Sequence, residues 1–266
     1  PAARAEPEPG AASAPSARAP AAPRRFYIRV GGARVQPASS SRELELADVT
    51  GPASLAVHDG PIPGSGAAFD AATVPALIVG YVLPTAGRRW SLETVLGLPF
   101  TVRFRATGTL ATMSIAPTAL GIPTGVGPLG PELGEATAAP PMLTAVYQLT
   151  DGGVVRPYVG AGAAVLIALD AKVTNPILTA VRRPEMSIAP APGVVGQVGV
   201  DLRVWRGVYA RLDVKFIAGM LARAEVKHVE VQTPGLPLFD TVEVGTAKMS
   251  VWLNPFVFQA GVGTDF

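Results

Sequence analysis

The sequence predicts an all-β fold, an eight-stranded antiparallel transmembrane up-and-down β-barrel over residues 26–266, preceded by a Pro/Ala-rich flexible, disordered tail over residues 1–25. Three observations favour this fold: an alternating carboxy-terminal segment that ends on an aromatic residue, a high apolar content without a span long enough for a membrane helix, and connections that are alternately short and long. From the composition alone a soluble β-sandwich is favoured, so the prediction of a transmembrane barrel depends on the pattern of the strands and their connections.

The last segment, 257–266, alternates between two kinds of side chain. A strand directs successive side chains to opposite faces. The opposite face is small or polar, and the apolar, aromatic face holds Phe256, Phe258, Ala260, Val262, Thr264 and Phe266. A closing strand of this kind is typical of an outer-membrane barrel.

The composition is rich in apolar residues and poor in charge. Hydrophobic residues make up 48% of the chain and charged residues 16%, whereas an average soluble domain carries about 25% charged residues. The longest apolar run, 159–169, is interrupted by glycines and is far shorter than the roughly 20 residues of a membrane helix. A barrel gives such a composition because lipid-facing and lumen-facing residues alternate. The net charge of +2, without a basic patch, gives no support to a nucleic-acid partner.

The first 25 residues differ from the rest in composition. They consist of Pro, Ala, Gly, Ser, Glu and Arg, with no aromatic or β-branched residue. Such a segment cannot bury enough apolar area to offset the entropy of ordering. It is predicted to be a flexible spacer, and the alternative is a segment that binds a periplasmic partner or the cell wall.

Eight strand-like runs follow, each bounded by turn residues. They cover 26–37, 73–83, 90–105, 141–149, 154–169, 194–204, 208–223 and 246–266. Three connections are tight turns, at 84–88, 150–153 and 205–207, and the Asp-Gly and Gly-Gly pairs in the second are strong hairpin signals. The other four connections are long, and they cover 38–72, 106–140, 170–193 and 224–245.

Short and long connections alternate strictly, with both termini on the short-turn side. Transmembrane barrels have short periplasmic turns and longer external loops, whereas a soluble sandwich has no reason to sort its connections. The pattern predicts a barrel in the outer membrane of a Gram-negative bacterium, with both termini periplasmic and with outer-membrane lipid and lipopolysaccharide around it.

Apolar and charged side chains occupy opposite faces of the runs. The charged face of the seventh run holds Tyr209, Arg211, Asp213 and Lys215, and the apolar face of the third holds Leu92, Leu96, Leu98, Phe100, Val102 and Phe104. A charge that faces lipid near the midplane costs several kcal/mol, about 2–4 for Arg or Lys, so the charged faces are predicted to line the lumen. Arg103 and Arg105 are expected near the outer rim, beside lipopolysaccharide phosphates or loop carboxylates.

Several motifs occur in matching order along residues 26–266. They are Arg29-Val30-Gly31, Leu98-Pro99-Phe100, Arg156-Pro157-Tyr158-Val159-Gly160-Ala161-Gly162, Gly196-Gln197-Val198-Gly199-Val200-Asp201 and Asn254-Pro255-Phe256-Val257-Phe258. With these motifs the chain resembles the OmpW family of outer-membrane proteins. The resemblance implies an eight-stranded barrel with a narrow, largely hydrophobic channel, which serves the uptake or passage of small apolar molecules and releases them sideways through the wall.

Eight strands leave an interior barely wide enough for side chains or one small ligand. Inward positions near the short turns are mainly charged, which predicts a charge plug formed by Glu93, Arg156, Asp201, Arg203, Arg211 and Asp213. Inward positions farther out predict an apolar channel or pocket lined by Met142, Leu166, Ile217, Val251, Leu253 and Val257. For the charges, structural ion pairing is favoured over gating; for the apolar set, core packing and a ligand pocket are both open.

The sequence offers no catalytic set. The two histidines, His58 and His228, fall in predicted external loops, no Gly-x-Ser-x-Gly segment is found, and no cofactor or metal is expected. The predicted function is a non-enzymatic outer-membrane barrel that forms a channel or pocket for small hydrophobic molecules. The alternative is a structural barrel whose tail docks a periplasmic protein.

Overall fold

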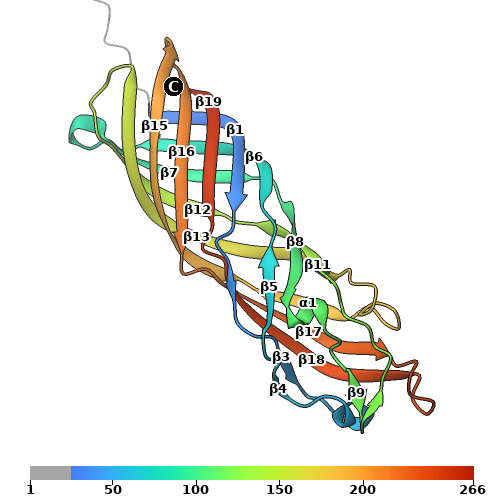
Figure 1. Cartoon of the computed structure of the whole chain (residues 1–266). Coiled ribbons are helices and arrows are strands. Elements are labelled where there is room, and N and C mark those ends of the chain that lie inside the picture. The colour runs from blue at the N-terminus through green and yellow to red at the C-terminus, as the bar shows by residue number, and fades with distance from the viewer. Residues whose placement is uncertain (1–24) are drawn as a thin grey trace, which may run out of the picture.

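Eight antiparallel strands form a closed ring around the lumen. The computed structural model describes residues 25–266 (Figure 1). The ring strands are β1 (Phe26–Gln36), β6 (Ala72–Val82), β7 (Trp90–Gly97), β12 (Met142–Gln148), β13 (Val155–Val173), β15 (Ala191–Trp205), β16 (Val208–Ala218) and β19 (Phe256–Asp265). Since β19 pairs with both β16 and β1, the sheet closes on itself. The predicted eight-stranded barrel is confirmed, and the predicted tail lies, except for Arg25, outside the described residues.

Most of the long connections continue the wall instead of forming irregular loops, which corrects the prediction. The added strands are β2 (Ser40–Ser41), β3 (Glu45–Ala47), β4 (Gly60–Pro61), β5 (Ser65–Phe69), β8 (Phe100–Gly108), β11 (Glu132–Ala139), β14 (Glu185–Ala189), β17 (Leu221–Gln232) and β18 (Thr241–Trp252). We call this part the extension, the barrel end with the short turns and Phe266 the terminal end, and the opposite end the loop end. The long strand β13 runs from the ring into the extension (Figure 1).

Short elements complete the loop end and one turn. They are the 3-10 helices η1 (Gly51–Leu55) and η2 (Ala86–Arg88), the helix α1 (Thr109–Thr112), and the hairpin of β9 (Thr118–Ala119) with β10 (Ile122–Pro123). None of the helices among residues 25–266 has the length and apolar character needed to cross a membrane.

The ring is apolar outside and charged inside. Glu93 and Arg211 are at most 1% exposed, while the outward residues of the same strands, such as Leu96 and Leu212, are more than half exposed. This reversal of the soluble pattern is the arrangement that a strand in lipid requires, because the alternating side chains face hydrocarbon on one side and the lumen on the other.

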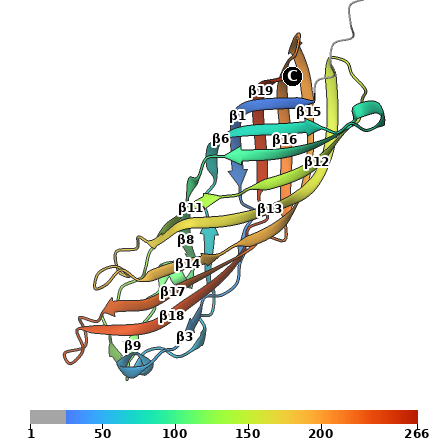
Figure 2. The same cartoon turned by 180° about the vertical axis from the view of Figure 1, so that it is seen from behind.

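The pattern inverts where the ring meets the extension. In β7 the inward residues are Glu93 and Val95, but in β8 they are Phe104 and Ala106. The shift of phase occurs at Leu98-Pro99, between the two strands, where Pro99 has no N–H to donate to a ladder. The extension continues the wall of the ring toward the loop end (Figure 2). It has an apolar interior and carries charges on its outer surface.

The third predicted run is therefore wrong in its second half. Phe100, Val102 and Phe104 face the interior rather than lipid, and both arginines of this strand face outward. Arg105 forms an ion pair with Asp70 at 2.8 Å on the outer surface. The change of side-chain direction marks the level at which the surroundings change from hydrocarbon to water.

Aromatic residues border the apolar band of the ring. At the terminal end Phe26 contacts Tyr81, with ring centroids 5.0 Å apart, and Trp90 contacts Tyr147 at 4.9 Å. At the level of the inversion Phe216 contacts Phe256 at 4.8 Å. The band between these two belts spans roughly eight residue steps of β16, or about 20 Å for a tilted strand, close to the apolar band of a typical outer-membrane barrel.

A charge placed on the two parts of the outer surface should have opposite outcomes. Leu212→Arg, in the middle of the apolar band, is expected to lower the free energy of unfolding in lipid vesicles by about 2–4 kcal/mol because the guanidinium meets hydrocarbon. The matched change Ser187→Arg, at an exposed position of the extension, should change it by less than about 0.5 kcal/mol. Equal losses in denaturant titrations of the two variants would contradict the assigned boundary.

Candidate functional site

Arg211 of β16 lies at the centre of the lumen of the ring. Its Nε and Nη2 donate to the two carboxylate oxygens of Asp201 at 2.8 and 2.9 Å, and its Nη1 donates to Glu93 Oε2 at 2.5 Å. The guanidinium also lies over the rings of Tyr158 and Tyr27, 4.7 and 5.2 Å from their centroids. A fork-shaped cation with two carboxylates and two aromatic faces is well compensated for its loss of water.

Further ion pairs spread from this centre across the lumen. Lys215 Nζ lies 2.5 Å from Asp213 Oδ1 and 3.6 Å from Glu93 Oε1. Toward the terminal end, Arg29 Nη2 lies 2.7 Å from Asp265 Oδ1 and 3.6 Å from Asp201 Oδ2. We call the whole set the lumen ion cluster; it consists of the four cations Arg29, Arg156, Arg211 and Lys215 and the four carboxylates Glu93, Asp201, Asp213 and Asp265, so it carries no net charge.

The structure brings together most of the residues of the predicted charge plug. Glu93, Asp201, Arg211 and Asp213 are all buried in the cluster, and Arg156 is half-buried at its edge, 3.5 Å from Asp265. Arg203 is different, because it lies next to the turn and its side chain is exposed. Lys215, absent from the predicted set, is fully buried; its place on the same strand face as Arg211 was the signal that could have identified it.

Two tyrosines complete the cluster, and each requires a glycine on the facing strand. The Tyr27 hydroxyl donates to Glu93 at 2.9 Å, and that of Tyr158 donates to Asp213 at 2.6 Å. A Cβ on Gly80 would lie 1.9 Å from Tyr27 Cζ, and one on Gly199 would lie 2.4 Å from the Tyr158 oxygen. The glycines therefore let the rings lie close against the wall.

A polar cavity of about 440 Å³ lies on the terminal side of the lumen ion cluster. Arg29, Arg89, Arg156 and Asp265 are among the residues that line it. In the turns at its mouth, hydrogen bonds from the Arg89 guanidinium hold the pKa of Asp151 below its usual value. We call it the terminal-end cavity.

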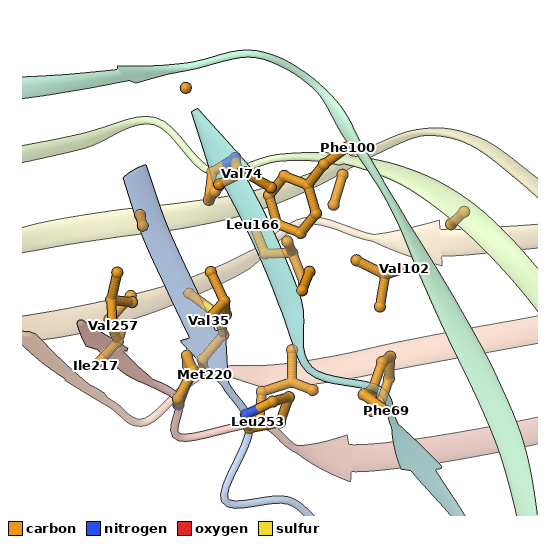
Figure 3. Close-up of a pocket in the computed structure, with 18 of the residues that line it drawn as sticks. Val35, Phe69, Val74, Phe100, Val102, Leu166, Ile217, Met220, Leu253 and Val257 are labelled. Atoms are coloured by element: carbon orange, nitrogen blue, oxygen red, sulfur yellow. The ribbon is translucent and has the colours of Figure 1, made fainter. Parts of the chain in front are cut away.

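An apolar cavity of about 100 Å³ lies on the other side of the cluster, at the level where ring and extension meet (Figure 3). We call it the waist cavity. Of the six predicted channel-lining residues, the five that contribute to its wall are Met142, Leu166, Ile217, Leu253 and Val257. Val251 is buried in the surrounding core but does not line the cavity. The waist cavity and the terminal-end cavity have no lining residue in common. The lumen ion cluster therefore separates an apolar cavity from a polar one.

A second apolar cavity, of about 70 Å³, lies farther toward the loop end, inside the extension. We call it the loop-end cavity. Phe104 lines both apolar cavities, and it is 3% exposed. Its ring is held edge-on against Phe69, with the centroids 4.9 Å apart. Phe104 therefore forms the neck between the two cavities, a role that the sequence did not indicate because this residue was placed on the lipid face.

The wall beside the waist cavity has a stretch without strand pairing. The β6–β7 ladder ends at Ala76↔Gly97, and the β5–β8 ladder ends at Phe69↔Phe104. Between these points, in the part of the chain that the structure describes, residues 71–75 and 98–102 form no ladder with one another; we call this stretch the wall gap. Both of its sides line the waist cavity, through residues such as Val74 and Val102 (Figure 3).

Neither histidine lies at the cavities. His58 is exposed near η1. His228 lies within β17 rather than in a loop, and its Nδ1 is 3.1 Å from Glu243 Oε1 on the exposed surface. Among residues 25–266, no group of three or more His, Asp or Glu side chains is arranged so that it could hold a metal ion.

Removing one carboxylate should destabilise the barrel strongly. Glu93→Gln deprives Arg211 and Lys215 of a shared partner while keeping the shape of the side chain. We expect the free energy of unfolding in lipid vesicles to fall by about 3–5 kcal/mol, since a buried charge is left uncompensated. The control Arg203→Gln, at an exposed position, should change it by less than about 0.5 kcal/mol. Matching denaturant midpoints for the two variants would show that the cluster contributes little.

Comparisons with known proteins agree with this architecture. The crystal structure of the outer membrane protein OprG from Pseudomonas aeruginosa superimposes with a TM-score of 0.67 at 20% identity, covering 91% of this chain and 96% of that one. The solid-state NMR structure of the outer membrane protein AlkL in lipid bilayers gives 0.55 at 15% identity, with 97% of each chain covered. At these identities the likeness concerns the fold alone.

A sequence relative extends the comparison. The dibenzothiophene metabolism operon protein PahQ of Pseudomonas aeruginosa is 28% identical over 178 residues, which cover 67% of this chain and 65% of the relative's length. The family model that matches is described as the OmpW family, and it covers residues 24–266. This chain therefore belongs to the OmpW family, whose members are β-barrels of the Gram-negative outer membrane.

Proposed function

We propose that the barrel is a passage by which small apolar molecules enter at the loop end and leave sideways into the outer membrane, without covalent chemistry. The observation that carries this proposal is the waist cavity, which lies beside the wall gap and is closed toward the terminal end by the lumen ion cluster. In this orientation the terminal end and its short turns face the periplasm, as in other transmembrane barrels.

A sideways exit requires far less free energy than an axial one. To pass along the axis, a ligand would have to separate several buried ion pairs around Arg211, and each broken pair costs about 3–5 kcal/mol. At the wall gap no ladder hydrogen bond has to break, because residues 71–75 and 98–102 form no ladder with one another. Pro75 and Pro99, one on each side of the gap, have no N–H to donate. The ligand would also remain in apolar surroundings from the waist cavity to the hydrocarbon.

The size of the cavities implies that side chains move during passage. At about 100 and 70 Å³, each apolar cavity is smaller than the roughly 150 Å³ cavity that admits benzene in another protein. A ligand must therefore displace Phe104 and join the two cavities. The name of the relative PahQ refers to the metabolism of dibenzothiophene, a flat apolar compound, which supports an aromatic hydrocarbon or a similar molecule as cargo.

The sequence predicts that Arg103 and Arg105 meet lipopolysaccharide phosphates or loop carboxylates, and contact with lipopolysaccharide is proposed for Arg103 alone. Arg103 is exposed just beyond the apolar band, where phosphates of the outer leaflet are expected. Arg105 already pairs with Asp70, a carboxylate beside the loop-end side of the wall gap.

The neck residue provides one test of the route. Phe104→Trp should slow the uptake of a labelled apolar compound by cells several-fold, because a larger ring fills the space between the cavities, and Phe104→Ala should accelerate it. Phe258→Ala is the matched control and should leave uptake unchanged, since Phe258 is exposed on the outer face of the ring and lines neither apolar cavity. Uptake at the wild-type rate in both Phe104 variants, at equal amounts of folded barrel, would rule out passage between the two cavities.

The wall gap provides a second test. The chain has no cysteine, so the double variant Val74→Cys/Val102→Cys carries only the two introduced thiols. A short crosslinking reagent can join these thiols through disulfide bonds that are cleaved by reduction. The crosslink should lower the rate of uptake at least tenfold because it obstructs the exit, and cleavage of the crosslink by reduction should restore the rate. The control pair Ala145→Cys/Ala161→Cys joins register partners in the closed part of the wall and should leave uptake unchanged. Full uptake in the bridged gap variant would show that cargo leaves elsewhere.

A further inference from the structure

The waist cavity contains one polar side chain whose hydrogen-bonding groups have no partner. Gln259 of β19 is 5% exposed and is one of the residues that line the cavity. Among the described residues, its amide oxygen and its amide nitrogen are both buried without a hydrogen bond. Buried polar groups in native proteins are nearly always satisfied, so this amide indicates a missing partner.

The neighbours of Gln259 do not supply that partner. On β1 it faces Ala33, which has no polar side-chain atom. On β16 it faces Asp213, whose carboxylate is engaged by Lys215 at 2.5 Å and by Tyr158 at 2.6 Å. The only other polar residue in the described wall of the cavity is Asp70, which pairs with Arg105 on the outer surface.

The amide therefore distinguishes one place on an otherwise apolar surface. It offers a carbonyl acceptor and an N–H donor side by side. A hydroxyl group can satisfy both, since it donates one hydrogen bond and accepts another. A charged group fits poorly, because Arg29 and Arg211, the two cations that line a small neighbouring cavity together with Gln259, are already paired with carboxylates. An unpaired ion in an apolar cavity is strongly disfavoured.

We propose that Gln259 is a specificity-determining residue, and that the preferred ligand of the waist cavity is a small apolar molecule with a single neutral hydroxyl group, an alcohol or a phenol. This inference rests on the proposed function and narrows it. The apolar body of the ligand lies among residues such as Ile217 and Leu253, and its hydroxyl group binds the Gln259 amide. A pure hydrocarbon fills the same space but leaves the amide unsatisfied.

Paired ligands that differ by one hydroxyl group test the inference. The dissociation constants of benzyl alcohol and toluene are measured for the full chain in lipid nanodiscs, and their ratio is compared between variants so that partitioning into lipid cancels. In Gln259→Leu the ratio of the benzyl alcohol constant to the toluene constant should rise at least about fivefold, because the leucine cannot form hydrogen bonds with the hydroxyl group. Gln148→Leu is the control: Gln148 also has an unpartnered buried amide oxygen, but it lines the terminal-end cavity.

A direct readout does not depend on the folding of the variant. The side-chain amide proton resonance of Gln259 in the wild-type barrel should move downfield when benzyl alcohol is added, because a hydrogen bond forms, and toluene, which has no hydroxyl group, should not produce this downfield shift. If both ligands bind but the ratio is unchanged in Gln259→Leu, or the resonance does not respond to the alcohol, the inference is wrong and the proposed function stands. If neither ligand binds the wild-type barrel, the proposed function itself fails. An equal change of the ratio in Gln148→Leu would also overturn the role of Gln259.

Discussion

The pairing of Arg211 with Glu93 and Asp201 is the interaction on which the rest of the barrel depends. A strand in lipid must turn its charges inward, and a ring of eight strands leaves little room there for water. The charges must then satisfy one another, which the lumen ion cluster achieves with equal numbers of cations and carboxylates. The stability of the ring and the closure of its axis thus have one cause.

The inversion of side-chain direction between ring and extension explains how one barrel serves two surroundings. Two residues between β7 and β8, Leu98-Pro99, shift the alternation by one position. A similar shift occurs between β16 and β17, where Gly219 adopts a φ of 79°. On the loop-end side of these points the interior is apolar, so the two apolar cavities begin where the lumen ion cluster ends. The break in alternation that moves charge to the outside also leaves the wall gap unpaired, since Pro99 lies within it.

Much of this could be predicted from the sequence, because alternation is a local property. The closing strand and the inward positions of Glu93, Asp201, Arg211 and Asp213 follow from a period of two, and the short turns follow from turn residues such as Asp-Gly. Phe104 could not be placed in this way, because a single shift at Leu98-Pro99 reverses every later residue of the run. Arg203 has the right parity, but next to a turn parity does not decide burial. The extension strands within 38–72 and 106–140 were missed because these segments, rich in Pro and Gly, resemble loops until their partners are known.

The small volume of the apolar cavities has a consequence for the membrane as a whole. A hydrated ion carries a shell of water that it gives up only at a large cost in free energy, and a narrow apolar constriction offers nothing in return. A hydrocarbon has no such hydration shell to lose, and in the proposed passage it displaces the side chains that line the cavities. In the proposed passage, the neck at Phe104 would admit apolar solutes and exclude ions, so that permeability to apolar molecules would not require ion conduction across the membrane.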